Sequence, residues 1–128
     1  MPDAATAEIL DLNQKLLQSI ASGDWKTYES LCDASLSCFE PEARGHLVQG
    51  LPFHKFYFDL GPSDGPRTTT MASPVVRLMG EVALVTYVRL VQYLDENGAA
   101  VTTHYDETRV WQKIGGRWQH VHFHRSPC

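Results

Sequence analysis

The 128-residue chain lacks the features that mark several common classes of protein. It has no cluster of lysine and arginine, and 15 acidic residues outnumber 11 basic ones, which gives a formal net charge of −4. Nucleic acids and anionic membranes both require a basic surface, so we expect neither as the main partner. The N-terminus has no basic stretch followed by an apolar run, so no signal peptide or membrane span is predicted. We therefore expect a cytoplasmic protein.

Cysteine is also scarce, because the chain has only three. Cys32, Cys38 and Cys128 form none of the close pairs that bind zinc or carry out redox chemistry. An odd number of separated thiols fits the reduced cysteines of a cytosolic protein. We interpret Cys32 and Cys38 as packing residues and Cys128 as a mobile terminal residue, and we predict neither a metal site nor a cofactor.

The composition that remains is that of an ordinary globular protein. Hydrophobic residues make up 43% of the chain and charged residues 20%, both typical of soluble domains. A chain of this length buries about two-thirds of its unfolded surface, which suffices for one domain and leaves no room for a second. We predict a single domain over residues 1–128.

The first half of the chain has the patterns of helices. Apolar residues recur at spacings of three and four after Asp3, which is placed to cap a helix, and Asp24 is placed to cap a second one. Pro52 stands at a position that the first turn of a helix tolerates. The predicted elements are helices over 3–21, 24–31 and 52–58 and extended pieces at 36–39 and 45–48.

The second half changes to the period of strands, after a loop predicted at 61–66 from its glycine and proline content. It is rich in valine, threonine and tyrosine, and glycine-containing turns divide it. The predicted strands are 67–78, 81–94, 99–112 and 117–126. Helices followed by a meander of strands indicate an α+β domain, in which helices pack on one face of a curved antiparallel sheet.

The opposite face of this sheet also carries apolar residues. The aliphatic side chains expected there are Val82, Leu84, Val88, Leu90 and Val110. Strands that are apolar on both sides need cover on both sides. We therefore expect the chain to form an oligomer.

Three arginines lie on strand faces that are otherwise apolar or aromatic, because residues two apart in a strand share a face. Arg89 shares its face with Tyr87 and Val91, Arg109 with Glu107 and Trp111, and Arg125 with Phe123. Buried guanidinium groups cost several kcal/mol unless they are neutralised, and Glu107 is the one obvious carboxylate on these faces. This pattern predicts a concave pocket that holds an anion. The alternative is that the arginines reach solvent on their methylene stems, or pair with carboxylates that the pattern does not place.

The last predicted strand contains His120, His122 and His124, which a regular strand would place on one face. Two such imidazoles could converge on a metal ion. No further donor is evident in the sequence, so we favour a polar or interface face.

Several long motifs, in order, carry a resemblance to a known family. They are Cys38–Ala43, the segment from Phe53 to Phe58, Leu78–Gly80, Gln92–Asp95, Glu107–Trp111 and the ending from Val121 to Ser126. The chain closely resembles the association (hub) domain of calcium/calmodulin-dependent protein kinase II over nearly its whole length. Motifs of this length and order are far more specific than one short pattern.

The resemblance implies a cone-shaped α+β fold of the NTF2-like kind, with a long N-terminal helix and short helices on a strongly curved antiparallel sheet. It also implies a homo-oligomer, namely a double-layered ring of stacked dimers with about a dozen subunits or more. In the family, arginines at positions matching Arg89, Arg109 and Arg125, with a histidine matching His54, bind small carboxylates. The sequence has no kinase or calmodulin-binding segment, so we expect either a stand-alone hub homologue or a hub domain taken from a longer protein. A protein kinase could be recruited to it in trans.

NTF2-like cones also house isomerases and dehydratases, so a small-molecule enzyme that uses the same cavity is the alternative function. Such chemistry commonly needs a base with a pKa near neutral. Glu107 among arginines would be a weak base, and His54 with Tyr57 is the other conceivable pair. We therefore predict no catalytic residues.

Overall fold

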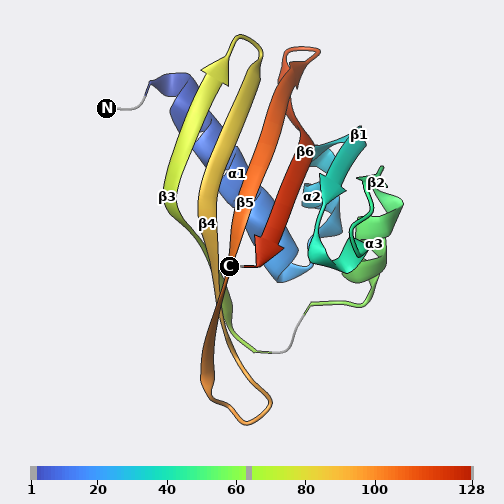
Figure 1. Cartoon of the computed structure of the whole chain (residues 1–128), viewed down its shortest axis with the longest axis vertical. Coiled ribbons are helices and arrows are strands. Elements are labelled where there is room, and N and C mark those ends of the chain that lie inside the picture. The colour runs from blue at the N-terminus through green and yellow to red at the C-terminus, as the bar shows by residue number, and fades with distance from the viewer. Residues whose placement is uncertain (1–2, 63–64, 128) are drawn as a thin grey trace.

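The computed structural model describes residues 3–62 and 65–127, and Figure 1 shows its elements in order. The predicted loop residues Ser63 and Asp64 and the terminal Cys128 lie outside the described residues. The elements are helices α1 (Ala4–Ser22), α2 (Trp25–Leu31) and α3 (Pro52–Asp59), a 3₁₀ turn η1 (Pro41–Ala43), and strands β1 (Cys32–Phe39), β2 (Val48–Gln49), β3 (Arg67–Met79), β4 (Val82–Leu94), β5 (Ala100–Ile114) and β6 (Arg117–Pro127).

The helices begin where the sequence predicts. The side chain of Asp3 accepts a hydrogen bond from the backbone N–H of Thr6, and that of Asp24 accepts one from Thr27. Such caps satisfy N–H groups that have no partner within the helix. Gly23 ends α1 with a φ of 71°, a left-handed conformation that glycine adopts without steric cost.

All strands belong to one sheet with the order β2-β1-β6-β5-β4-β3. The four long strands form the predicted antiparallel meander, in which each strand pairs with the next one along the chain. The parallel pairing of β1 with β6 was not predicted. Strand β1 is also twice as long as the expected 36–39 piece. The second extended piece is also shorter than predicted and covers only Val48–Gln49.

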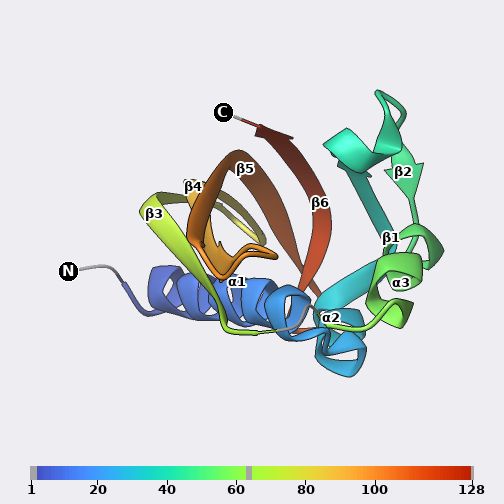
Figure 2. The same cartoon turned by 90° about the horizontal axis from the view of Figure 1, so that it is seen from below.

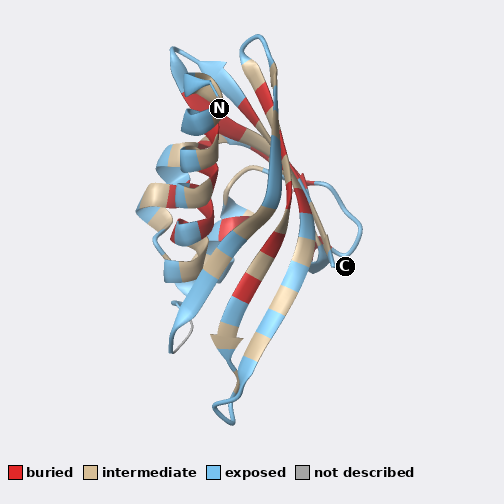
Figure 3. Ribbon diagram, turned by 90° about the vertical axis from the view of Figure 1, so that its left-hand side faces the viewer, coloured by how far each residue is buried: buried red, intermediate tan, exposed pale blue. Residues whose placement is uncertain are grey.

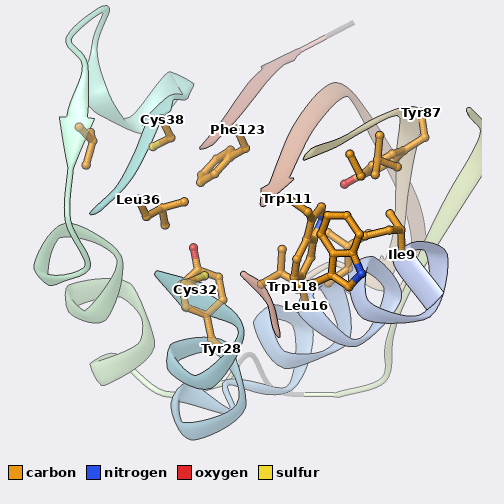
Figure 4. Close-up of a cluster of buried hydrophobic side chains, with 14 of the residues drawn as sticks. Ile9, Leu16, Tyr28, Cys32, Leu36, Cys38, Tyr87, Trp111, Trp118 and Phe123 are labelled. Atoms are coloured by element: carbon orange, nitrogen blue, oxygen red, sulfur yellow. The ribbon is translucent and has the colours of Figure 1, made fainter. Parts of the chain in front are cut away.

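The sheet is strongly curved, and the helices lie on its concave side (Figures 2 and 3). Helix α1 packs against β3 through a face on which Ile9, Leu16 and Leu17 are fully buried. Burying a side chain of this size stabilises the fold by about 1.5–3 kcal/mol. Figure 4 shows the core, in which Trp111 lies beside Leu16 and Ile9 of α1, and Phe123 lies near Leu36 and Cys38 of β1. The fold is thus the predicted α+β arrangement.

The convex side of the sheet carries the predicted aliphatic residues, and none of the described helices covers it (Figure 3). From Val82 to Val91 of β4, buried residues alternate with half-buried ones, and Val82, Leu84, Val88 and Leu90 belong to the second set. Cross-strand neighbours extend this surface, because Val110 of β5 pairs with Leu84 and Met79 of β3 pairs with Val82. We call this surface the convex face. None of the described helices has the length and apolar character that crossing a membrane requires.

Candidate functional site

The concave side of the sheet and the helices enclose a cavity of about 420 Å³. Its wall includes all four predicted ligand-binding residues, His54, Arg89, Arg109 and Arg125. His54 comes from α3, and the arginines come from β4, β5 and β6 respectively. The alternation of strand side chains therefore placed the arginines on the correct face.

Glu107 is the centre of the charged groups beneath this cavity. Its side chain is fully buried, and it accepts hydrogen bonds from the Tyr87 hydroxyl at 2.5 Å and from Arg109 Nε at 3.1 Å. Arg89 Nη1 donates to its other oxygen at 3.3 Å. Burial alone would raise the pKa of Glu107, but Arg109 and Arg89 hold it below its ordinary value. Glu107 is thus a charged counter-ion at neutral pH.

Arg109 is the more tightly held of the two guanidinium groups that share Glu107. It is 1% exposed and lies over the Phe123 ring, with its Cζ atom 4.3 Å from the ring centroid. Its Nη2 is 3.0 Å from Glu107, and its Nη1 is 3.5 Å from Nε2 of His120. Burial alone would lower the pKa of Arg109, yet Glu107 raises it above the ordinary value. Arg109 therefore fixes the positive charge at the cavity floor.

Arg89 is held less completely. Its Nε donates to the Thr69 hydroxyl at 3.3 Å and its Nη1 to Glu107. Its second terminal nitrogen, Nη2, has no hydrogen bond to the described residues. Every fully buried side-chain nitrogen and oxygen among them has a partner, so Nη2 is not fully buried. Nη2 of Arg89 is therefore reachable from the cavity.

Arg125 has carboxylate partners that the strand pattern did not reveal. Its Nη2 donates to Glu42 at 2.6 Å and lies 3.6 Å from Glu40. These glutamates flank Pro41, where the chain leaves β1 and enters η1. The alternative that the arginines pair with carboxylates which the pattern does not place therefore holds for Arg125, because Glu40 and Glu42 follow β1, which pairs with β6. The Glu-Pro-Glu segment contains these carboxylates, but their position beside Arg125 depends on the pairing of β1 with β6, which was not predicted.

His54 lies among aromatic rings and is 6% exposed. Its Nδ1 is 3.7 Å from Glu40, and its Nε2 is 3.7 Å from the Cys38 sulfur. Burial lowers the pKa of His54 to about 4, and the nearby positive charge of Arg109 acts in the same direction. At neutral pH His54 is therefore an uncharged imidazole.

The strand histidines do not share one face as predicted. A β-bulge separates them, since His120 pairs with Trp111 while His122 pairs with Val110, which leaves Val121 as an extra residue. His120 turns inward and is fully buried beside Cys32, whereas His122 bonds Ser37 on the convex side. The favoured interpretation of these histidines as one polar or interface face is therefore wrong for His120, and the bulge also separates it from the other two as a metal ligand.

A different group, Cys38, Glu40 and His54, brings three donor atoms within 4.8 Å of one another. These atoms could hold a soft divalent metal. Burial raises the pKa of the Cys38 thiol to about 12, and the charge of Glu40 acts in the same direction, so the thiolate ligand is not preformed. The adjacent guanidinium of Arg125 opposes a further cation. We draw no metal site from these residues.

Comparison with known proteins supports the resemblance read from the motifs. Residues 5–128 match the family of the calcium/calmodulin-dependent protein kinase II association domain. The chain is 48% identical over 126 residues to the calcium/calmodulin-dependent protein kinase type II alpha chain of Drosophila melanogaster. The match covers 96% of this chain and 24% of that protein. The chain belongs to the association-domain family of calcium/calmodulin-dependent protein kinase II.

Solved structures of association domains have the same fold. The CaMKII hub homology domain of Chlamydomonas reinhardtii superposes with a TM-score of 0.91 at 51% identity, covering 98% of this chain and 99% of that one. A putative NTF2-like dehydratase from Streptomyces avermitilis, at 19% identity, covers 100% of this chain and 99% of that one with a TM-score of 0.80, which establishes the NTF2-like fold alone. This association domain spans about a quarter of the length of the curated kinases it matches.

Proposed function

We propose that this chain is an oligomerisation hub that assembles into a closed, double-layered ring of stacked dimers, with about a dozen subunits or more. The observation that carries the proposal is the convex face, where half-buried aliphatic residues of neighbouring strands form one surface. Contiguous apolar surfaces of this kind typically mark protein–protein contacts. Membership of the association-domain family supports the same reading.

The experiment that tests this proposal places a charge on the convex face. Leu84 lies between Arg77 of β3 and Val110 of β5 in the sheet, so a carboxylate there has a cation nearby within the subunit. An interface of ordinary size buries about 800 Å² per partner, and taking a carboxylate out of water costs several kcal/mol even when a cation lies nearby. Leu84→Asp should therefore reduce the assembly to smaller species in analytical ultracentrifugation.

Gln18→Asp is the matched control, because it places the same carboxylate on the exposed side of α1. It should leave the assembly intact. Circular dichroism must show that both variants fold. A folded Leu84→Asp variant with the mass of the wild-type assembly would contradict the proposal that the convex face is an interface.

The second part of the proposal is that the cavity binds a small carboxylate. Arg89 offers a free N–H, and Arg109 supplies a fixed positive charge. Arg125 and the uncharged imidazole of His54 complete the wall. Planar guanidinium groups suit the two oxygens of a carboxylate. Arg89→Gln should abolish the stabilisation of the protein by butyrate, whereas Arg117→Gln, at the exposed start of β6, should not.

Catalysis has weaker support than binding. The pKa of Glu107 is held low by its arginines, and His54, with a pKa of about 4, is a weak base at neutral pH. The likeness to a putative dehydratase concerns the fold alone. Recruitment of a protein kinase to the assembly stays a prediction from the family.

A further inference from the structure

One arginine on the cavity wall was absent from the predicted site. Arg67, the first residue of β3, lines the main cavity and also a smaller one of about 180 Å³ beside it. The two cavities share Arg67, Arg89 and three apolar or aromatic residues, Ile20, Tyr57 and Phe58. The junction of the cavities is therefore flanked by two guanidinium groups.

Arg67 differs from the other cavity arginines in its partners. Arg89 and Arg109 share Glu107, and Arg125 pairs with Glu42. Among residues 3–62 and 65–127, Arg67 makes no ion pair, and its one interaction is with the Tyr93 ring, whose centroid is 4.9 Å from its Cζ atom. Its positive charge is available to a ligand.

The register of the sheet places the two guanidinium groups at a spacing that a short ligand can span. Arg67 pairs with Tyr93 and Met71 pairs with Arg89, so Arg89 lies one strand across and four residues along from Arg67, at about 14 Å between Cα atoms. The hydrogen bond of Arg89 to Thr69 draws its side chain toward Arg67. Long, flexible arginine side chains can approach each other across this gap, so dicarboxylates with about two to four linking methylene groups are the lengths to test.

The net charge differs between parts of the cavity and favours an anion near Arg67 and Arg89 over one near Arg125. Glu40 and Glu42 lie there against one guanidinium, that of Arg125, so the excess charge is negative. At the floor, Arg89 and Arg109 share the single carboxylate of Glu107, so the excess is positive. A second positive group, Arg67, stands at the junction. The cavity thus has two positive positions, at its floor and at the junction, and a negative position beside Arg125 of β6.

We propose that the cavity binds small dicarboxylates, with one carboxylate on Arg89 and the second on Arg67. This inference rests on the proposed carboxylate-binding function and names its ligand class. Each carboxylate meets a local excess of one positive charge, and the linking methylene groups lie beside Ile20 and Phe58. A charge-assisted contact of this kind corresponds to a gain in affinity of about tenfold or more.

The test is isothermal titration calorimetry of the assembled protein at constant ionic strength with matched pairs of acids. The pairs are butyrate with succinate, pentanoate with glutarate, and hexanoate with adipate. At least one dicarboxylate should bind about tenfold more tightly than its matched monocarboxylate. In Arg67→Gln the ratio of the two Kd values should fall to about one. Arg67→Lys keeps the charge without the planar fork and should retain part of the preference.

Arg117→Gln is the control for loss of one exposed guanidinium and should keep the full dicarboxylate preference. The inference would be overturned by equal affinity for both members of every pair, or by a dicarboxylate preference that survives in Arg67→Gln. In either case the proposed function would still stand if monocarboxylates bind and Arg89→Gln removes that binding. If neither class of acid binds, the proposed carboxylate-binding function fails together with the inference.

Discussion

The substitution Glu107→Gln tests whether the buried charges beneath the cavity hold this fold together. Glutamine keeps the shape of the side chain and removes its charge, which leaves Arg109, at 1% exposure, without a carboxylate partner. Breaking a buried ion pair in this way costs roughly 3–5 kcal/mol. For a chain of this size that loss corresponds to a fall in Tm of roughly 10–20 °C.

Glu42→Gln is the matched control, because it makes the same chemical change in an ion pair whose glutamate side chain is 34% exposed. Pairs open to solvent contribute about 1 kcal/mol or less. Both variants should be measured by calorimetry at one protein concentration, since assembly makes the Tm depend on concentration. A Glu107→Gln variant that melts within about 3 °C of the wild type, or no lower than Glu42→Gln, would refute the reasoning.

The double variant Glu107→Gln/Arg109→Met separates the pair from its surroundings. Removing both charges leaves no buried guanidinium at the Arg109 position, so its loss of stability should be smaller than the sum of the two single losses. A coupling energy of about 1–3 kcal/mol is expected for groups in direct contact. Strictly additive losses would mean that Glu107 and Arg109 act independently.

Three further predictions concern other parts of the molecule. The folded pKa of His54, about 4, lies below its unfolded value of roughly 6.5, so the unfolded chain binds the extra proton. His54 thereby lowers stability by roughly 3 kcal/mol as pH decreases between these values. Burial also lowers the pKa of His120, so the stability of His54→Gln should fall less steeply with decreasing pH than that of the wild type, and His46→Gln should match the wild type. Asn13 accepts a hydrogen bond from the buried Trp111 indole at 3.0 Å, so Asn13→Ala should cost about 1–3 kcal/mol in urea unfolding, and a neutral effect would show that the indole finds another partner. Asp95 accepts from the backbone N–H groups of Asn97 and Ala99, so Asp95→Ala should cost about 1 kcal/mol, measured as a lower Tm, and an unchanged Tm would show that this turn does not depend on its side chain.

Local patterns predicted the elements because local physics decides them. The caps at Asp3 and Asp24 and the two-residue period of the long strands act within a few positions of the chain. The inward direction of Arg89, Arg109 and Arg125 followed from alternation alone.

The features that the sequence did not predict depend on contacts between distant segments. The bulge at Val121 reverses the expected face of His120, and no local signal marks it. The parallel pairing of β1 with β6 brings Glu42 to Arg125, 83 positions along the chain. Arg67 escaped notice because its position beside Arg89 depends on the register of β3 with β4, which a one-residue slip would reverse.

Native mass spectrometry of the wild-type protein tests the central claim, that this chain is an oligomerisation hub, most directly. A ring of about a dozen copies of the 14.4 kDa chain would have a mass of roughly 170 kDa, and larger closed rings would add dimers to it. We predict one or a few discrete masses at or above that value, each an even multiple of the chain. A dominant 14.4 kDa species at micromolar concentration would contradict the account.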